Sequence, residues 1–179
     1  GEGTVSDVMA SIEFCIENKN KYNISVITMS LGSASLYSSY CDNDYVLYGV
    51  FSELINEAIN AGILVVAASG NDNNSTNIPF PACLENVTAV GATTKSDNVD
   101  ESYSNSATIL DLLAPGTNIT SAKFNSDIFY SKDGTSMAAP HVAGAALLLR
   151  NFKRLENGSI LDPLQIRSIL KLTGDNITD

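Results

Sequence analysis

Basic side chains are scarce in this sequence of 179 residues. Its 10 lysines and arginines stand against 20 aspartates and glutamates, so the formal net charge is −10 at pH 7. Nucleic acids and anionic membrane surfaces are bound through clustered positive charge, and no such cluster occurs along the chain. The composition therefore predicts no nucleic-acid partner and no membrane partner.

Long hydrophobic runs and a secretory leader are also missing. No apolar stretch approaches the roughly 20 residues that a membrane span needs. The first residues show neither the basic nor the apolar region of a signal peptide, so we expect the sequence to begin inside a larger unit. With 44% hydrophobic residues, residues 1–179 have the length and composition of one domain with a sizeable core.

Cysteine is rare as well, with only Cys15, Cys41 and Cys83. Three cysteines are too few for a disulfide scaffold, and their spacing is not that of a metal site. No acidic cluster has a recognisable calcium-ligand spacing. The residues alone therefore predict no metal centre.

Two helices are indicated near the ends of the chain. Ser6 or Asp7 can cap a helix whose apolar face includes Cys15, which we expect to be a buried free thiol. Asp162 and Pro163 provide an N-cap and a first-turn proline for a last helix.

The middle of the chain alternates between extended and helical patterns. Residues 26–30 and 63–68 are short continuous apolar runs, typical of parallel strands covered on both faces. An amphipathic helix between them ends at Gly62. Its apolar residues are Val46, Val50, Leu54 and Ala58, with Phe51, Ile55 and Ile59 beside this row. A helix between two such strands predicts an α/β fold with a parallel sheet.

Segment 134–149 combines small, apolar side chains with one early hydroxyl. After a turn at Gly134 the helix shows no polar face, which places it in the centre of the protein. Pro140 is tolerated only in a first turn, so Ser136 lies at or next to the helix N-terminus. The free N–H groups and positive dipole end there favour an alkoxide or an oxyanion. A core helix after an N-capping serine describes the same residues.

The eleven residues of segment 134–144, Gly-Thr-Ser-Met-Ala-Ala-Pro-His-Val-Ala-Gly, resemble the nucleophile segment of the subtilisin-like serine proteases. The resemblance implies that Ser136 attacks the scissile carbonyl to form an acyl-enzyme. It also implies a three-layer, doubly wound α/β domain with a mostly parallel sheet. Segments 103–106 and 110–116 resemble family segments too, so the likeness covers essentially the whole chain.

A second motif lies where the strand at 63–68 ends. Ala67-Ala68-Ser69-Gly70-Asn71 resembles the family's oxyanion-hole segment, which implies that the Asn71 amide and the Ser136 backbone N–H hold the developing negative charge. In an open α/β sheet, ligands bind beyond the carboxyl ends of the strands, where Asn71 is expected. Taken alone, this asparagine also suits a left-handed turn.

The resemblance further implies an extended substrate. In the family a Gly-x-Gly edge segment pairs with the substrate, which assigns this role to Gly1 and Gly3. The run that ends the first strand forms one wall of the primary specificity pocket and binds substrate backbone, which assigns Ser30, Leu31 and Gly32.

Ala68, Gly70 and Pro79 complete the implied specificity pocket. These walls carry no charge, and Asp72 is the nearest acid. Because burying an unpaired cation is costly, we expect the pocket to favour a medium or large apolar side chain.

An esterase is the alternative interpretation of the serine motif, since Gly-Thr-Ser-Met-Ala is one residue from the α/β-hydrolase elbow. That fold needs a histidine after the nucleophile, and only His141 follows Ser136. Five residues along a helix rise roughly 7.5 Å and rotate about 500°, so the two side chains point apart. We therefore exclude this interpretation and assign His141 a structural role.

The family's remaining catalytic groups, an aspartate and a histidine, precede the nucleophile in the chain. Their motifs are absent, so we expect residues 1–179 to be the C-terminal two-thirds of a subtilisin-like catalytic domain, incomplete on its N-terminal side. The hypotheses are a fragment of a serine endopeptidase, a pseudoprotease that binds peptide without cutting it, and a non-catalytic structural domain. Retention of both Ser136 and Asn71 argues against the last.

Some subtilisin-like proteins carry cysteines at positions that resemble Cys41 and Cys83, which implies a disulfide between them. A secreted protease meets the oxidising conditions that permit the bond. The family needs no cofactor for its chemistry, although calcium often accompanies the intact domain. The expected partners are a peptide or protein substrate, the missing N-terminal part and, through exposed strand edges, other copies of the chain.

Overall fold

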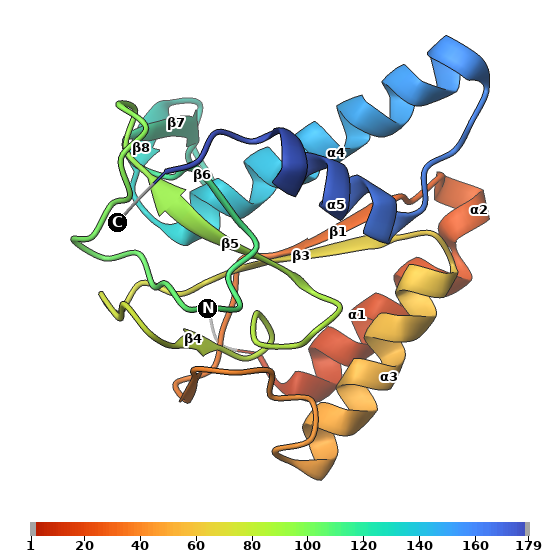
Figure 1. Cartoon of the computed structure of the whole chain (residues 1–179), viewed down its shortest axis with the longest axis horizontal. Helices are drawn as coiled ribbons and strands as arrows, with labels where there is room; N and C mark the ends of the chain where they lie inside the picture. The colour runs from red at the N-terminus through yellow and green to blue at the C-terminus, as the bar shows by residue number, and fades with distance from the viewer. Residues whose placement is uncertain (1–2, 178–179) are drawn as a thin grey trace.

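Residues 3–177 are described by a computed structural model, and they form an α/β fold around a parallel sheet (Figure 1). The four strands are hydrogen-bonded in the order β1-β3-β5-β6. Their bounds are Val26–Met29 for β1, Leu64–Ala68 for β3, Thr88–Thr93 for β5 and Leu112–Pro115 for β6. All neighbouring pairs are parallel, which confirms the predicted fold class.

Helices cover both faces of this sheet (Figure 1). On one face α1 (Val5–Glu17) packs against α3 (Val46–Asn60), and a short helix, α2 (Lys19–Tyr22), follows α1. On the other face lie α4 (Thr135–Asn157) and α5 (Pro163–Thr173). Successive residues of a strand point to opposite faces, so Val65 belongs to the first core cluster and Val66 to the second. The fold therefore has three layers.

Two small antiparallel pairs stand outside the main sheet. β2 (Leu36–Tyr37) pairs with β4 (Ile78–Pro79), and β7 (Ile119–Ala122) pairs with β8 (Phe129–Lys132). The β7–β8 hairpin leads directly into α4, whose first turn lies near the carboxyl ends of the parallel strands (Figure 1).

The beginning of α1 differs from the prediction. Thr4, and not Ser6 or Asp7, is the N-cap, and Asp7 closes a capping box by accepting from the Thr4 backbone N–H. These hydrogen bonds also lower the pKa of Asp7, with the Thr4 hydroxyl as the main cause. Cys15 is free as expected, but it is half-buried.

The buried side of α3 agrees with part of the predicted pattern. Val46 is 89% and Val50 45% exposed, whereas Leu54 and Ala58 in the row, and Phe51 and Ile55 beside it, are buried. A row taken at every fourth residue advances about 40° around the helix at each step. A row with a spacing of four therefore drifts away from the buried side of the helix. Residues at alternating spacings of three and four remain on that side. Gly62 has a φ of 80° and follows the helix as predicted.

The edge strand β1 is less covered than expected. It pairs with β3 alone among the described residues, its first two residues are half-buried, and Thr28 is exposed. The prediction of a strand covered on both faces is therefore wrong for β1. It is right for β3, where all five residues are buried.

Only one side of helix α4 is buried in the core, although the sequence predicted a helix in the centre of the protein. Ala138, Ala139, Val142 and Ala146 are buried against the sheet, whereas Leu148 is 73% exposed. None of the helices within residues 3–177 has both the length and the apolar character needed to cross a membrane.

Candidate active site

Asn71 lies just after β3, where the sequence places it. Its Oδ1 accepts two hydrogen bonds from Thr135, one from the backbone N–H at 2.9 Å and one from the hydroxyl at 3.0 Å. Because the side-chain oxygen is occupied in this way, the amide nitrogen Nδ2 is the free end of the side chain. Asn71 therefore presents a donor beside the first turn of α4.

Ser136 is the second residue of α4 and is half-buried. This placement confirms the predicted position at the helix N-terminus. Helix geometry gives its backbone N–H no intrahelical acceptor. Neither this N–H nor the Oγ forms a hydrogen bond within residues 3–177.

The two free donor nitrogens both lie near Gly134. This residue has a φ of 150° and a ψ of 154°, and a Cβ added to it would lie 3.6 Å from Asn71 Nδ2, 3.7 Å from Asn71 Oδ1 and 3.7 Å from the Ser136 nitrogen. Glycine leaves that volume open. Two N–H donors near a hydroxyl are the groups from which an oxyanion hole is built.

Pro140 lies in the second turn of α4, not in the first as predicted. A proline there has no N–H to donate to the carbonyl four residues earlier, which belongs to Ser136. The Ser30 hydroxyl donates to this carbonyl instead, at 2.9 Å. A tertiary contact thus replaces the missing helical bond and joins the end of β1 to the serine.

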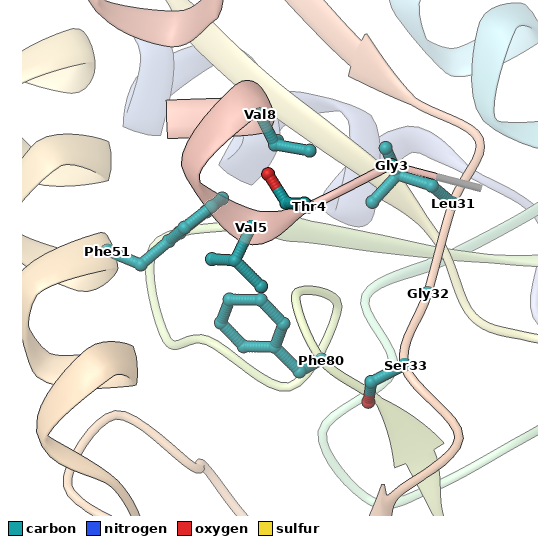
Figure 2. A pocket seen from close by; sticks show the side chains of 9 residues that line it. All are labelled: Gly3, Thr4, Val5, Val8, Leu31, Gly32, Ser33, Phe51 and Phe80. Carbon is teal, nitrogen blue, oxygen red and sulfur yellow. The ribbon is translucent and has the colours of Figure 1, made fainter. Parts of the chain in front are cut away.

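Of the glycines assigned to substrate, Gly1 lies outside the described residues. Gly3, Leu31 and Gly32 line one cavity of about 360 Å³ (Figure 2). The remaining lining is mainly apolar: Thr4, Val5, Val8, Ser33, Phe51 and Phe80. Figure 2 shows the start of α1 and the segment at Leu31 on opposite sides of this space. The cavity can therefore take an apolar side chain next to both segments.

Pro79 occupies the space between the two predicted pocket walls. A Cβ on Gly32 would lie 3.0 Å from Pro79 Cγ, and one on Gly70 would lie 3.0 Å from Pro79 Cδ. The proline ring therefore contacts both glycines. Ala68 is buried at the end of β3. Ala68, Gly70 and Pro79 do not line the cavity of Figure 2, which lies beyond Gly32.

His141 is exposed, and its Nδ1 lies 2.8 Å from the carbonyl oxygen of Met137. It shares a shallow cavity of about 290 Å³ with Ser136, but no hydrogen bond joins the two side chains. This is the single histidine of the sequence. The described residues therefore offer Ser136 no histidine as a base, and a structural role for His141 stays a prediction.

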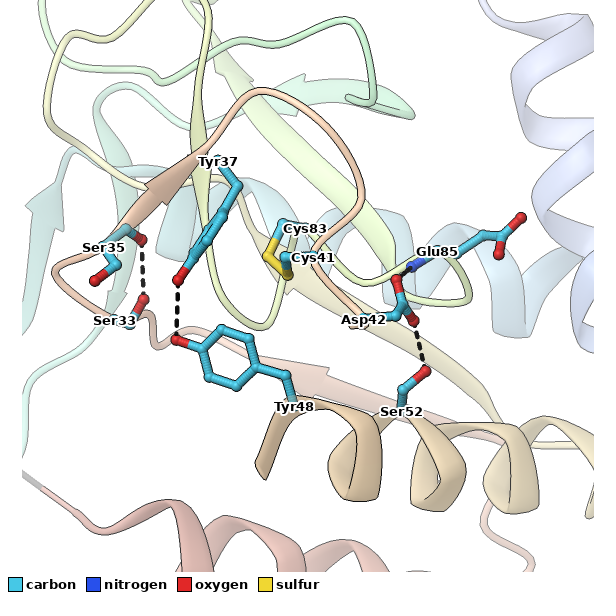
Figure 3. Close-up of a disulfide and its surroundings, with 9 residues drawn as sticks. All are labelled: Ser33, Ser35, Tyr37, Cys41, Asp42, Tyr48, Ser52, Cys83 and Glu85. Carbon is cyan, nitrogen blue, oxygen red and sulfur yellow. Dashed lines mark hydrogen bonds between the residues drawn. A yellow bond between two sulfur atoms is a disulfide. The ribbon is translucent and has the colours of Figure 1, made fainter. Parts of the chain in front are cut away.

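Cys41 and Cys83 form a disulfide, with their Cα atoms 5.5 Å apart (Figure 3). This is the pairing that the family resemblance implies. The neighbouring Asp42 accepts from the Ser52 hydroxyl at 2.5 Å and from the Glu85 N–H at 3.1 Å. The segment around Cys41 is thus fixed both to α3 and to the loop after β4.

Two contributors to the site were not identified from sequence. Thr135 holds the Asn71 oxygen, and the fully buried Asn105 holds the loop around Asn71. The one available signal for Thr135 was its place at the start of a helix, where side chains and backbone N–H groups seek partners. For Asn105 the only signal was that segment 103–106 resembles a segment of the subtilisin family.

A network of polar side chains includes Tyr103, next to the turn that contains Asn105. Burial raises the pKa of Tyr103, whose hydroxyl lies 2.9 Å from Thr117 Oγ1. Hydrogen bonds from Ser102 and then from Thr117 lower the pKa of Asp100. Within residues 3–177, no group of three or more histidine, cysteine, aspartate or glutamate side chains could hold a metal ion. The described residues therefore do not fit a calcium site of acidic ligands.

Sequence comparison gives a consistent family. The model of the subtilase family, Peptidase S8, matches residues 1–178. The chain is 35% identical to Subtilisin DY of Bacillus licheniformis, over all of this chain and 58% of that protein. It is 34% identical to Subtilisin-like protease 1 of Arthroderma gypseum, over 92% of this chain and 32% of that protein. The chain thus spans less than two-thirds of the length of these relatives.

Solved structures agree with the sequence comparison. A cold adapted subtilisin-like serine proteinase superposes with a TM-score of 0.77 and 31% identity, covering 100% of this chain and 59% of that one. A lanthipeptide protease superposes with a TM-score of 0.81, covering 99% of this chain and 60% of that one, but at 23% identity it supports the fold alone. The matched family model and the shared fold show that this chain belongs to the subtilase family of serine proteases.

Proposed function

We propose that the chain carries the nucleophile and the oxyanion donors of a serine endopeptidase. The observation that carries the proposal is that Asn71 Nδ2 and the Ser136 nitrogen both lie near Gly134, beside a hydroxyl without a hydrogen-bond partner in the described part of the chain. Family membership makes peptide or protein the substrate. Each of these groups has a place in acyl transfer.

In the proposed reaction, Ser136 Oγ attacks the scissile carbonyl carbon and gives its proton to a histidine from outside this chain. The carbonyl oxygen becomes an oxyanion, held by Asn71 Nδ2 and the Ser136 N–H. When the C–N bond breaks, the histidine returns the proton to the departing amine and an ester remains on Ser136. Water then hydrolyses this ester by the same steps and restores the hydroxyl.

We further propose that residues 1–179 are the C-terminal part of the catalytic domain. The chain covers 58% of Subtilisin DY, and its single histidine is not bonded to Ser136. The aspartate and histidine of the triad would then come from a part of the domain that precedes these residues. The exposed apolar side chains of α4 and the edge of β1 are surfaces that such a part would cover, or through which copies of the chain would associate.

The substrate would add as an extended strand beside Gly1 to Gly3 and Ser30 to Gly32. The cavity of Figure 2 suits an apolar side chain of that strand. At the primary pocket the Pro79 ring already contacts both Gly32 and Gly70. We therefore propose a small apolar side chain there, a smaller one than the sequence indicated.

The proposed function also suggests where the protein is located and which cofactors its reaction needs. The disulfide Cys41–Cys83 suits a secreted or extracellular protein, because the bond persists under oxidising conditions. The proposed acyl transfer uses no cofactor. Calcium in the intact domain stays a proposal, and no step of the reaction depends on it.

Peptide binding without cleavage is the second candidate, and the absence of a base bonded to Ser136 within residues 3–177 favours it. A reconstitution experiment separates the two. The chain would be incubated with a fluorophosphonate probe and an apolar peptide ester, alone and together with the N-terminal region of Subtilisin DY that precedes the matched part. The variant Ser136→Ala is the matched control.

We expect the chain alone to react slowly, because an unactivated serine is a poor nucleophile. Reconstitution should raise turnover steeply. In subtilisin itself, a member of this family, loss of the nucleophile or histidine lowers kcat by about 10⁶, and this family value sets the scale of the expected gain. Rapid stoichiometric labelling of Ser136 in the isolated chain would contradict the fragment proposal. A folded reconstituted complex that binds peptide but never cleaves it would favour the second candidate.

A further inference from the structure

The loop that carries Asn71 is held by one buried side chain, Asn105. The Asn105 Oδ1 accepts from the Asp72 N–H at 2.8 Å and from the Asn74 N–H at 3.1 Å, and its Nδ2 donates to Asp72 Oδ2 at 2.9 Å. Asn105 is 0% exposed. Both polar atoms of the Asn105 side chain therefore bond to Asp72 and Asn74, which follow Asn71 in the loop.

The backbone of Asn105 holds the residues that precede Asn71. Its N–H donates to the Gly70 carbonyl at 3.0 Å, and its carbonyl accepts from the Ser69 hydroxyl at 2.9 Å. Gly70 has a φ of 96°, and a Cβ there would overlap Asn105 Nδ2. The glycine thus allows both the left-handed turn and the close approach of the amide.

Asn71 itself makes no hydrogen bond to Asn105. Within residues 3–177, the hydrogen-bond partner of its side chain is Thr135 at the start of α4. The residues on either side of Asn71 are therefore fixed to Asn105, while its side chain reaches across to α4. The direction of the free Nδ2 depends on both attachments.

We propose that Asn105 is a positioning residue that aims the Asn71 amide at the oxyanion. The proposal rests on the proposed function for the role of Asn71, but the positioning itself is a property of the chain without substrate. Loss of the Asn105 side chain leaves two N–H groups of the loop without their acceptor, and such groups turn toward water or toward new partners. The Asn71 side chain then loses its fixed approach to Thr135.

Amide hydrogen exchange of the full chain tests this without any catalytic assay. The Thr135 N–H donates to Asn71 Oδ1, so its exchange rate reports whether Asn71 keeps its orientation. In Asn105→Ala we expect the protection of the Asp72, Asn74 and Thr135 N–H groups to fall at least about tenfold, in keeping with the loss of a buried hydrogen bond. The N–H of Ala146, in the middle of α4, should keep its protection.

Ser106→Ala is the matched control. Ser106 follows Asn105 and its backbone N–H donates to the Asn74 carbonyl at 2.7 Å, but its hydroxyl makes no hydrogen bond in the described part of the chain. This variant should leave Thr135 unchanged. Asp72→Ala provides a second test at an exposed position, where it removes the acceptor of Asn105 Nδ2. We expect a smaller fall at Thr135 than in Asn105→Ala.

Either of two results for Asn105→Ala would overturn the proposal. Faster exchange at Asp72 and Asn74 with unchanged Thr135 would show that Asn105 holds the loop without positioning Asn71. An equal fall at Thr135 and Ala146 would show a general effect on stability. Should Asn105→Ala not fold, Asp72→Ala decides, and an unchanged Thr135 in that variant would overturn the proposal. A failed reconstitution would leave these readings intact, so the two proposals fail separately.

Discussion

The two faces of the parallel sheet are covered in different ways. On the α1–α3 face, large buried side chains of α3 such as Phe51 and Ile55 belong to the core cluster, and the Cys41–Cys83 disulfide fixes a neighbouring loop (Figure 3). On the α4–α5 face the helix meets the sheet through small residues such as Ala138 and Ala146. The outer side of α4 stays exposed and apolar there.

The disulfide and the largest buried aromatic side chains therefore lie on one side of the sheet, and Ser136 lies on the helix of the other. The α1–α3 face is held by large apolar contacts and a covalent bond, so it carries much of the stability. The α4 face brings Ser136 close to the sheet because alanines allow the helix to approach. Its exposed leucines are available for contact with another part of a domain or another molecule.

The largest effect is expected in the core of the α1–α3 face. Phe51→Ala removes a fully buried ring that meets Phe80 edge to face. It should lower the free energy of unfolding by about 3–5 kcal/mol. Leu148→Ala, at a side chain 73% exposed, should change it by less than about 0.5 kcal/mol. Urea titration of both variants measures the difference, and equal losses would show that the two faces do not differ in this way.

Removal of the disulfide should have the next effect. The bond closes a loop with a sequence separation of 42, and the double variant Cys41→Ala/Cys83→Ala should lose about 3–4 kcal/mol through the freer unfolded chain. Thermal unfolding should shift down by about 6–15 °C. Cys15→Ala, at the free cysteine, serves as the control. A shift of similar size in the control would contradict this account.

Pro79 lies where the disulfide-fixed region meets the proposed pocket, since its carbonyl accepts from the Cys83 N–H at 3.0 Å. Pro79→Gly should open the space between Gly32 and Gly70. In the reconstituted enzyme, the ratio of kcat/KM for a phenylalanine ester over an alanine ester should rise about 10–200-fold, the range expected for added room in an apolar pocket. An unchanged ratio would place the primary pocket elsewhere.

The smallest predicted effect is on acid stability. The folded pKa of Asp100 is lowered by the Ser102 and Thr117 hydrogen bonds, from an ordinary value of 3.8. A lowered folded pKa gives stability that is present above the unfolded pKa and is lost as the pH falls through the folded pKa. Asp100→Asn should therefore flatten the decline in unfolding free energy below about pH 4. Asp127→Asn, at an exposed aspartate outside the described hydrogen bonds, should leave the decline unchanged.

The sequence predicts those features that depend on local signals. The buried strand β3, the stop at Gly62 and the Asp162–Pro163 start of α5 all follow from short patterns, and the structure confirms them. The position of Ser136 at a helix start follows in the same way.

Other features depend on contacts that no local pattern contains. Pro140 lies inside α4 because the Ser30 hydroxyl, 106 residues from Ser136, replaces the missing N–H. The support of Asn71 by Thr135 and of its loop by Asn105 also joins residues far apart in the chain. The sequence names the residues that would react, and the fold supplies those that orient them.

The cap of α4 has a consequence for the order of folding. Gly134 has no side chain with which to cap the helix, so the first N–H of α4 is satisfied by Asn71, 64 residues earlier in the chain. Bringing Asn71 and Thr135 together costs conformational entropy, because 64 residues separate them. We expect the contacts of the formed sheet to offset this cost. We therefore expect pulse-labelling exchange to show Thr135 gaining protection late in refolding, after the centre of α4. The serine would thus acquire its environment only in a chain that has otherwise folded.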